Sequence, residues 1–159
     1  MANWNEIESA APAFAARVRD RFEAGTNKTL ATLRADGSPR ISASECKFEA
    51  GELTLGMMGG SLKLQDVRRD PRVALHSPTL EPPPQGPDAP PDAEPWLGDA
   101  KMAGRLIEID PPSDNQFAGA GFFRLDITEV ALTYVGDPPD HLVIESWHPD
   151  VGYRRRTRT

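Results

Sequence analysis

An anion-binding pattern stands out in the middle of the sequence. Gly59 and Gly60 allow the backbone to approach a ligand closely, and Ser61 is a good N-cap for the short helix predicted over residues 62–69. The free amide groups at a helix N-terminus favour a bound anion. The spacing therefore predicts a turn that could hold a phosphate group.

Two cationic side chains fit the same chemistry. Lys63 lies in the first turn of the predicted helix, where a positive charge opposes the helix dipole unless a negative group lies nearby. Arg40, on a preceding predicted strand, could supply a second cation. From spacing alone, an ordinary capped helix with a solvated lysine is the simpler interpretation.

The cysteine and histidine residues form no pattern typical of a catalytic or metal site, and no catalytic residue is predicted. Cys46 is the only cysteine, which excludes an intrachain disulfide and a zinc site made of several thiolates. His76, His141 and His148 are scattered without metal-ligand spacing, so we expect no metal site.

Short strands make up most of the elements that would position these residues. An apolar stripe from Ile7 to Phe22 predicts one N-terminal helix, and Asp36-Gly37 predicts a hairpin turn. Many short strands with tight turns favour a mainly β barrel or sandwich of about six to seven antiparallel strands, with a short helix after the third strand. The predicted strands cover residues 28–34, 39–48, 52–58, 73–76, 100–109, 122–135 and 141–147.

Chain length and composition predict one domain over residues 1–159. Half of the sixteen prolines fall between residues 78 and 97, interleaved with acidic residues, which predicts a long extended loop inside the domain. Arginines crowd the basic C-terminal tail at 153–159, and the simplest interpretation of that tail is a frayed, solvated end.

The net charge of −6 argues against nucleic-acid binding. No apolar run approaches the length of a membrane span, and the N-terminus has no apolar signal stretch. We therefore expect a soluble, cytoplasmic protein with neither nucleic acid nor membrane as a partner.

The segment 28–76 resembles the pyridoxamine 5′-phosphate oxidase-like, FMN-binding split-barrel family. The shared order is a strand, an Asp-Gly-Ser-Pro-Arg turn ending at Arg40, a second strand, and a Ser-x-Lys helix that ends in Arg-Asp-Pro-Arg-Val at Val73. The similarity is looser from 100 to 147, and the proline-rich loop has no counterpart. The resemblance implies a split β-barrel that pairs into a homodimer and holds FMN at the interface.

The same resemblance implies roles for individual residues. One strand would contact the flavin edge and phosphate, the next would lie beside the ring, and the turn before the helix would bind the phosphate, with Lys63 as the main cation. Near the C-terminus, Trp147 and the arginines after Tyr153 would reach the cofactor or substrate from the partner chain. The implied cofactor-binding residues are Arg40, Ile41, Ser42, Met57, Met58, Ser61, Leu62, Lys63 and Trp147.

One departure from the family pattern keeps other functions open. Ser42, Ala43 and Ser44 stand where relatives carry bulky residues, and no set of residues for gripping a second phosphate is found. We therefore expect an FMN-dependent oxidoreductase that transfers hydride to or from a small conjugated substrate other than pyridoxamine phosphate. The alternatives are a deazaflavin-dependent reductase on the same fold and a non-enzymatic dimer that binds flavin or haem.

Overall fold

The structure, a computed structural model, describes residues 2–84, 87 and 89–159. Within this part of the chain, nine strands and three helices are present. The helices are α1 (Trp4–Ala10), α2 (Pro12–Glu23) and α3 (Leu62–Arg69). The strands are β1 (Lys28–Leu33), β2 (Pro39–Ser44), β3 (Cys46–Glu49), β4 (Glu52–Met57), β5 (Arg72–His76), β6 (Asp99–Ile109), β7 (Gly121–Val135), β8 (Leu142–His148) and β9 (Gly152–Arg158).

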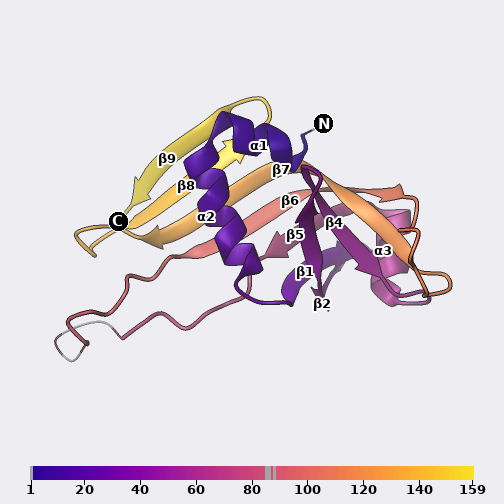
Figure 1. Cartoon of the computed structure of the whole chain (residues 1–159), viewed down its shortest axis with the longest axis horizontal. Helices are drawn as coiled ribbons and strands as arrows, with labels where there is room; N and C mark the ends of the chain where they lie inside the picture. Colours follow the sequence, from indigo (N-terminus) through magenta and orange to yellow (C-terminus); the bar gives the residue numbers. More distant parts are fainter. Residues whose placement is uncertain (1, 85–86, 88) are drawn as a thin grey trace.

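The strands form one antiparallel sheet in the order β2-β1-β5-β6-β7-β4-β3, and β8 and β9 extend it from β7 (Figure 1). The long strand β7 serves two parts of this sheet, because its first residues pair with β4 and its last residues pair with β8. The strand β6 runs along most of β7, and the register shifts between Ala103 and Gly104 because β7 carries one extra residue there, Thr128, as a β-bulge that bends β7. The predicted fold class, a mainly β split barrel, is confirmed.

The second predicted strand is two strands that meet at a corner. β2 pairs with β1, whereas β3 pairs with β4, and Glu45 separates them. The chain therefore changes partners between Ser44 and Cys46, which joins the two ends of the sheet path and closes the barrel. This corner is one reason why the described strands number nine rather than six to seven.

The arginine-rich C-terminus is the other reason. We expected a frayed tail, but β9 pairs with β8 in continuous register from Leu142↔Arg158 to His148↔Gly152. The hairpin is anchored by Glu145, a buried carboxylate that accepts hydrogen bonds from Arg17 on α2 and from the hydroxyl of Tyr153. Four arginines on an edge strand also discourage pairing with other chains.

The predicted N-terminal helix is two helices. Asn3 and Glu6 form a capping box at α1, and the helix ends at Ala10 because Pro12 starts α2 as a new helix. The predicted apolar stripe is buried on both helices, and α1 and α2 cover the sheet beside β6 and β7 (Figure 1). The core between these layers includes Phe22, Leu30, Leu125 and Ile127.

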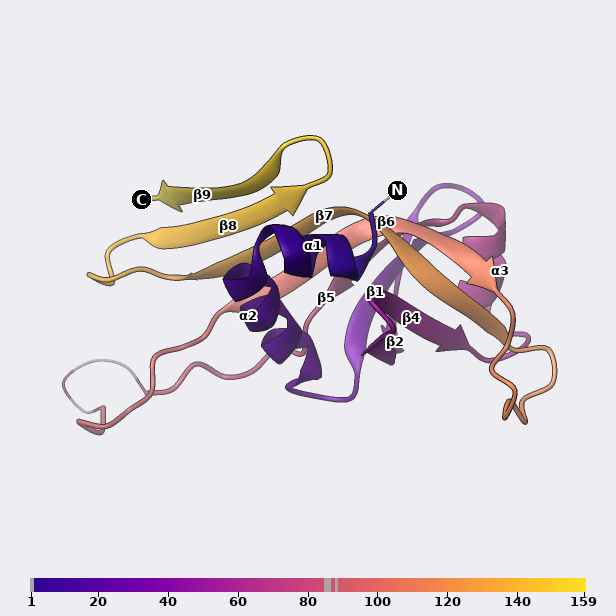
Figure 2. The ribbon, with the colours of Figure 1, turned by 45° about the horizontal axis from the view of Figure 1, so that its top comes forward.

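The proline-rich segment between β5 and β6 leaves the body of the molecule as an extended loop (Figure 2). Its base is closed by the amide of Ser77, which donates to the carbonyl of Ala100 (2.8 Å), and by the amide of Ala100, which donates to Ser77 Oγ (3.1 Å). The predicted loop also includes residues 85, 86 and 88, which lie outside the described residues. None of the helices in the described part of the chain has both the length and the apolar character needed to span a bilayer.

Candidate binding site

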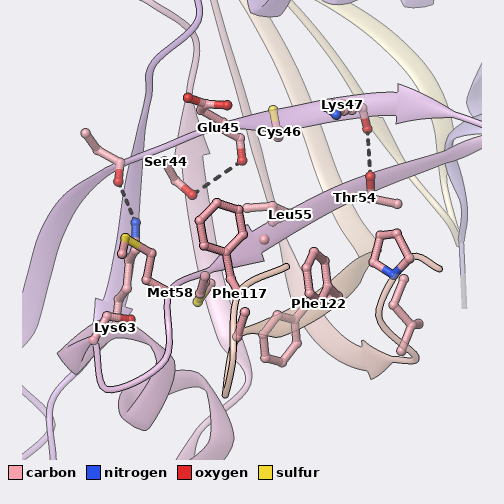
Figure 3. Close-up of a pocket in the computed structure, with 18 of the residues that line it drawn as sticks. Ser44, Glu45, Cys46, Lys47, Thr54, Leu55, Met58, Lys63, Phe117 and Phe122 are labelled. Atoms are coloured by element: carbon pink, nitrogen blue, oxygen red, sulfur yellow. Dashed lines mark hydrogen bonds between the residues drawn. The ribbon is translucent and has the colours of Figure 1, made fainter. Parts of the chain in front are cut away.

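A pocket of about 690 Å³ lies where the barrel corner, the end of β4 and the start of α3 meet the loop between β6 and β7 (Figure 3). This volume is in the range of sites that hold cofactors and other small molecules. Its walls are largely apolar, and they include Leu55, Met57, Met58 and Phe122. The side chain of Met57 is buried, whereas that of Met58 is 70% exposed.

The anion end of the pocket is formed by the first turn of α3. Ser61 caps this helix by accepting a hydrogen bond from the amide of Leu64 (3.4 Å), and the first turn contains no acidic residue. The other amide groups at this helix start have no intrahelical acceptor. Both Ser61 and Lys63, two residues of the predicted phosphate-binding turn, line the pocket.

The ammonium group of Lys63 points across the pocket toward β2. Its Nζ donates a hydrogen bond to the carbonyl oxygen of Ala43 at 2.7 Å, and the side chain is half-buried (Figure 3). Burial lowers the pKa of Lys63. A partly desolvated ammonium group that already lines a pocket interacts with a ligand anion more strongly than a fully solvated lysine does.

Arg40 lies behind the pocket wall instead of lining it. Its Nε donates to Asp66 Oδ2 at 2.7 Å, and Asp66 also accepts hydrogen bonds from Thr32 Oγ1 (2.8 Å) and Arg69 Nη2 (3.0 Å). Burial alone would raise the pKa of Asp66, but hydrogen bonds from Arg40, Thr32 and Arg69 outweigh it and hold the pKa at about 2. This ionised carboxylate fixes α3 against β1 and β2 and thereby positions Lys63.

The other predicted residues lie in three different places. Ile41 and Leu62 are 74% and 56% exposed and do not line the pocket, and Ser42 is half-buried on the opposite face of β2 from Ile41. Trp147 requires a correction, because its side chain is only 4% exposed and belongs to the hydrophobic core. It therefore does not extend from the chain toward a partner's ligand.

Sequence reasoning missed several residues that the fold brings to the pocket. Cys46 lines it from the corner, where burial raises the pKa of the thiol to about 11 and keeps it protonated at neutral pH. Phe117 lies on the loop between β6 and β7, a segment without periodic signals, so only the folded structure reveals its position. Asp66 could have been noticed, because it occupies the apolar face of the helix between Leu64 and Val67.

These features define the protein at the level of its fold. The fold is a split barrel, and its pocket lies at the N-terminus of α3. No protein-family model matches the chain, and no curated protein matches it. The fold is shared with a pyridoxamine 5′-phosphate oxidase-related, FMN-binding protein from Nostoc punctiforme, at 12% identity and a TM-score of 0.60 over 100% of this chain and 98% of that one.

Two further solved structures have the same fold. PhzG from Burkholderia lata, solved with tetrahydrophenazine-1-carboxylic acid, matches at 9% identity and a TM-score of 0.65, covering 98% of this chain and 93% of that one. The haem storage protein HutZ from Vibrio cholerae matches at 13% identity and a TM-score of 0.51, covering 73% and 88%. The resemblance to the pyridoxamine 5′-phosphate oxidase-like split barrel is thus confirmed for the fold.

Proposed function

We propose that this protein binds FMN in the pocket and acts as a flavin-dependent oxidoreductase on a small conjugated substrate. The observation that carries the proposal is the pairing of Lys63 and the N-terminus of α3 with an otherwise mainly apolar pocket. A phosphate tail and a flat ring are the two halves of a ligand that such a pocket fits. The FMN-binding relative from Nostoc punctiforme supports this choice of ligand.

The residues present fit the two halves of FMN. Ser61, the amide groups of the first turn of α3 and Lys63 would hold the phosphate, and Lys63 would exchange the carbonyl of Ala43 for a phosphate oxygen. Gly56 and Phe122 line the pocket next to each other, because a Cβ atom on Gly56 would lie 3.4 Å from the Phe122 ring, and the flat ring of FMN would contact Phe122 here. Met57 and Met58 would contact the ring with adaptable, polarizable side chains.

When bound, the flavin supplies the hydride-transfer chemistry, and the protein supplies binding and orientation. Asp66 keeps α3 in place, and Lys63 fixes the tail, so the ring would be held at a constant depth in the pocket. The apolar walls would exclude water from the ring. Hydride exchange with a stacked substrate requires no acid or base from the chain.

We also propose that a second copy of the chain covers the pocket. Exposed apolar side chains lie around its mouth: Met58 lines it, Ile41 shares the outer face of β2 with Ala43, and Leu62 precedes Lys63. Exposed apolar groups gathered in this way are typical of an interaction surface.

We expect a dimer by light scattering, and we expect Ile41→Glu to yield a monomer that binds FMN more weakly. The control Val135→Glu, on an exposed part of β7, should leave the dimer intact, and a wild-type monomer that binds FMN fully would contradict the shared site.

The test of the proposed cofactor is a titration of the purified protein with FMN, followed by flavin fluorescence. Lys63→Ala should weaken binding by about 10- to 100-fold, because a hydrogen bond to a charged group contributes about 1.5–3 kcal/mol. Lys101→Ala, an exposed lysine on β6, is the matched control and should change nothing. Equal affinities of the wild type and Lys63→Ala would remove Lys63 from the site.

The absorption spectrum of the protein as purified separates FMN from the two alternatives. FMN gives a yellow band, a deazaflavin coenzyme absorbs at shorter wavelength, and haem gives an intense Soret band. The described residues that line the pocket include no histidine, the common axial ligand of haem, so the pocket favours a flavin.

A further inference from the structure

The far wall of the pocket is the loop of residues 110–120 between β6 and β7, and one aromatic side chain on it projects into the pocket. Phe117 is 66% exposed, yet its ring points toward Leu55 and Ser44 on the opposite wall (Figure 3). A large apolar ring left accessible inside a pocket is typical of a ligand contact. The core packing of the chain does not account for it, because Phe117 is not part of the hydrophobic core.

The backbone that carries this ring is fixed locally. Asn115 contacts both polar backbone groups of Phe117: its Oδ1 accepts from the Phe117 amide at 3.0 Å, and its Nδ2 donates to the Phe117 carbonyl at 3.2 Å. The amide of Ala120 donates to the same carbonyl at 3.3 Å. Phe117 is therefore presented from a turn with satisfied hydrogen bonds, even though it lies in a loop.

The same loop packs directly on the turn that precedes the anion end. A Cβ atom on Gly59 would lie 2.8 Å from the carbonyl oxygen of Ala118 and 2.9 Å from the carbonyl carbon of Gly119, which is closer than real side chains allow. The glycine at position 59 thus permits contact between this loop and the Gly59–Lys63 turn. The loop that carries the aromatic ring is therefore in direct contact with the turn that carries the anion end.

We propose that Phe117 is the stacking residue of the pocket, with Asn115 as its positioning residue, and that this pair makes the site selective for ligands with a planar aromatic ring. This inference rests on the proposed function, because it assigns the ring of FMN to Phe117 when the phosphate lies at Lys63. Aromatic rings stack in offset or edge-to-face arrangements that add to the effect of buried area. A pre-positioned ring loses little freedom when the ligand binds.

The experiment compares FMN binding by the full chain with that of Phe117→Leu and Phe117→Trp. Leucine keeps the apolar volume but removes the ring face, so FMN affinity should fall about three- to tenfold. Tryptophan should retain affinity and quench the emission of bound FMN more than phenylalanine does. Inorganic phosphate, used as a competitor, reports on the anion end alone, and its affinity should be unchanged in Phe117→Leu but reduced in Lys63→Ala.

A double-mutant cycle tests the role of Asn115. Asn115→Ala should weaken FMN binding in the wild-type background but have little further effect once Phe117 is leucine, since a positioning residue acts through the ring. Val135→Ala, an exposed apolar residue away from the pocket, is the control and should leave FMN affinity unchanged. Thermal unfolding of each variant verifies that it is folded.

The outcomes separate this inference from the proposed function. If the wild type does not bind FMN, both are overturned. If the wild type binds FMN and Phe117→Leu binds it equally well, the assignment of Phe117 is wrong and the proposed function stands. An equal effect of Asn115→Ala with and without Phe117 would overturn the positioning role, because the loss would then be merely structural.

Discussion

The buried carboxylate of Asp66 yields the sharpest stability prediction. The carboxylate is 3% exposed and accepts hydrogen bonds from Thr32, Arg40 and Arg69. Its pKa of about 2 in the folded protein lies below the ordinary value of 3.8. A depression of this size corresponds to roughly 2 kcal/mol of stability at neutral pH, since each pKa unit is equivalent to about 1.4 kcal/mol.

The substitution Asp66→Asn approximates the protonated carboxyl group at every pH. We expect it to lower the free energy of unfolding at pH 7 by about 2–3 kcal/mol, because the amide NH₂ group would also face a donor. The folded pKa is depressed, so the stabilisation is complete above about pH 4 and is lost as the pH falls toward 2. The difference between wild type and variant should therefore shrink as the pH falls below 4.

Urea unfolding at several pH values measures this difference, and Asp70→Asn provides a matched control. The pKa of Asp70 is also held at about 2, by hydrogen bonds from Arg72, but this pair lies at the surface and solvent screens it. We expect a much smaller loss from the control variant. Equal stability of the wild type and Asp66→Asn at pH 7, or a difference that does not change with pH, would refute the reasoning.

Three further predictions concern other parts of the fold. Glu145→Gln should lower the free energy of unfolding by about 2–3 kcal/mol, because Glu145 is 1% exposed and binds both terminal nitrogens of Arg17; an unchanged melting temperature would contradict this. The native thiol of Cys46 should react slowly with iodoacetamide at pH 8, because its pKa is about 11, and rapid labelling of the folded protein would show that it is accessible. Gly59→Ala should cost about 1–3 kcal/mol by pushing the Ala118 carbonyl away, as measured by denaturant unfolding, and wild-type stability would disprove the close contact.

The sequence predicted the elements whose ends carry local signals. The structure begins α3 at Leu62, after the Ser61 cap, and ends it at Arg69, just before Pro71, as predicted. The Asp36-Gly37 turn joins β1 and β2, and Gly37 has the positive φ of 82° that such a turn requires. Turn and cap chemistry act over a few residues, so these features can be recognised without the fold.

Long-range contacts determine the features that the sequence did not reveal. The strand β9 has no alternating apolar pattern that would mark it as a strand, and it forms because β8 offers a free edge and Glu145 binds Tyr153. Trp147 resembles an exposed ligand contact in the sequence, yet its register on β8 turns it into the core. Phe117 reaches the pocket only because the loop after β6 packs on Gly59, 58 residues earlier in the chain.

A comparison of FMN with riboflavin, which lacks the phosphate group, tests the central claim most directly. Both ligands would place the same ring in the pocket, but only FMN would engage Ser61 and Lys63 at the start of α3. Isothermal titration of the wild-type protein should show FMN binding about 10- to 100-fold more tightly, and Lys63→Ala should reduce most of that preference. Equal affinity for the two ligands would contradict the phosphate site.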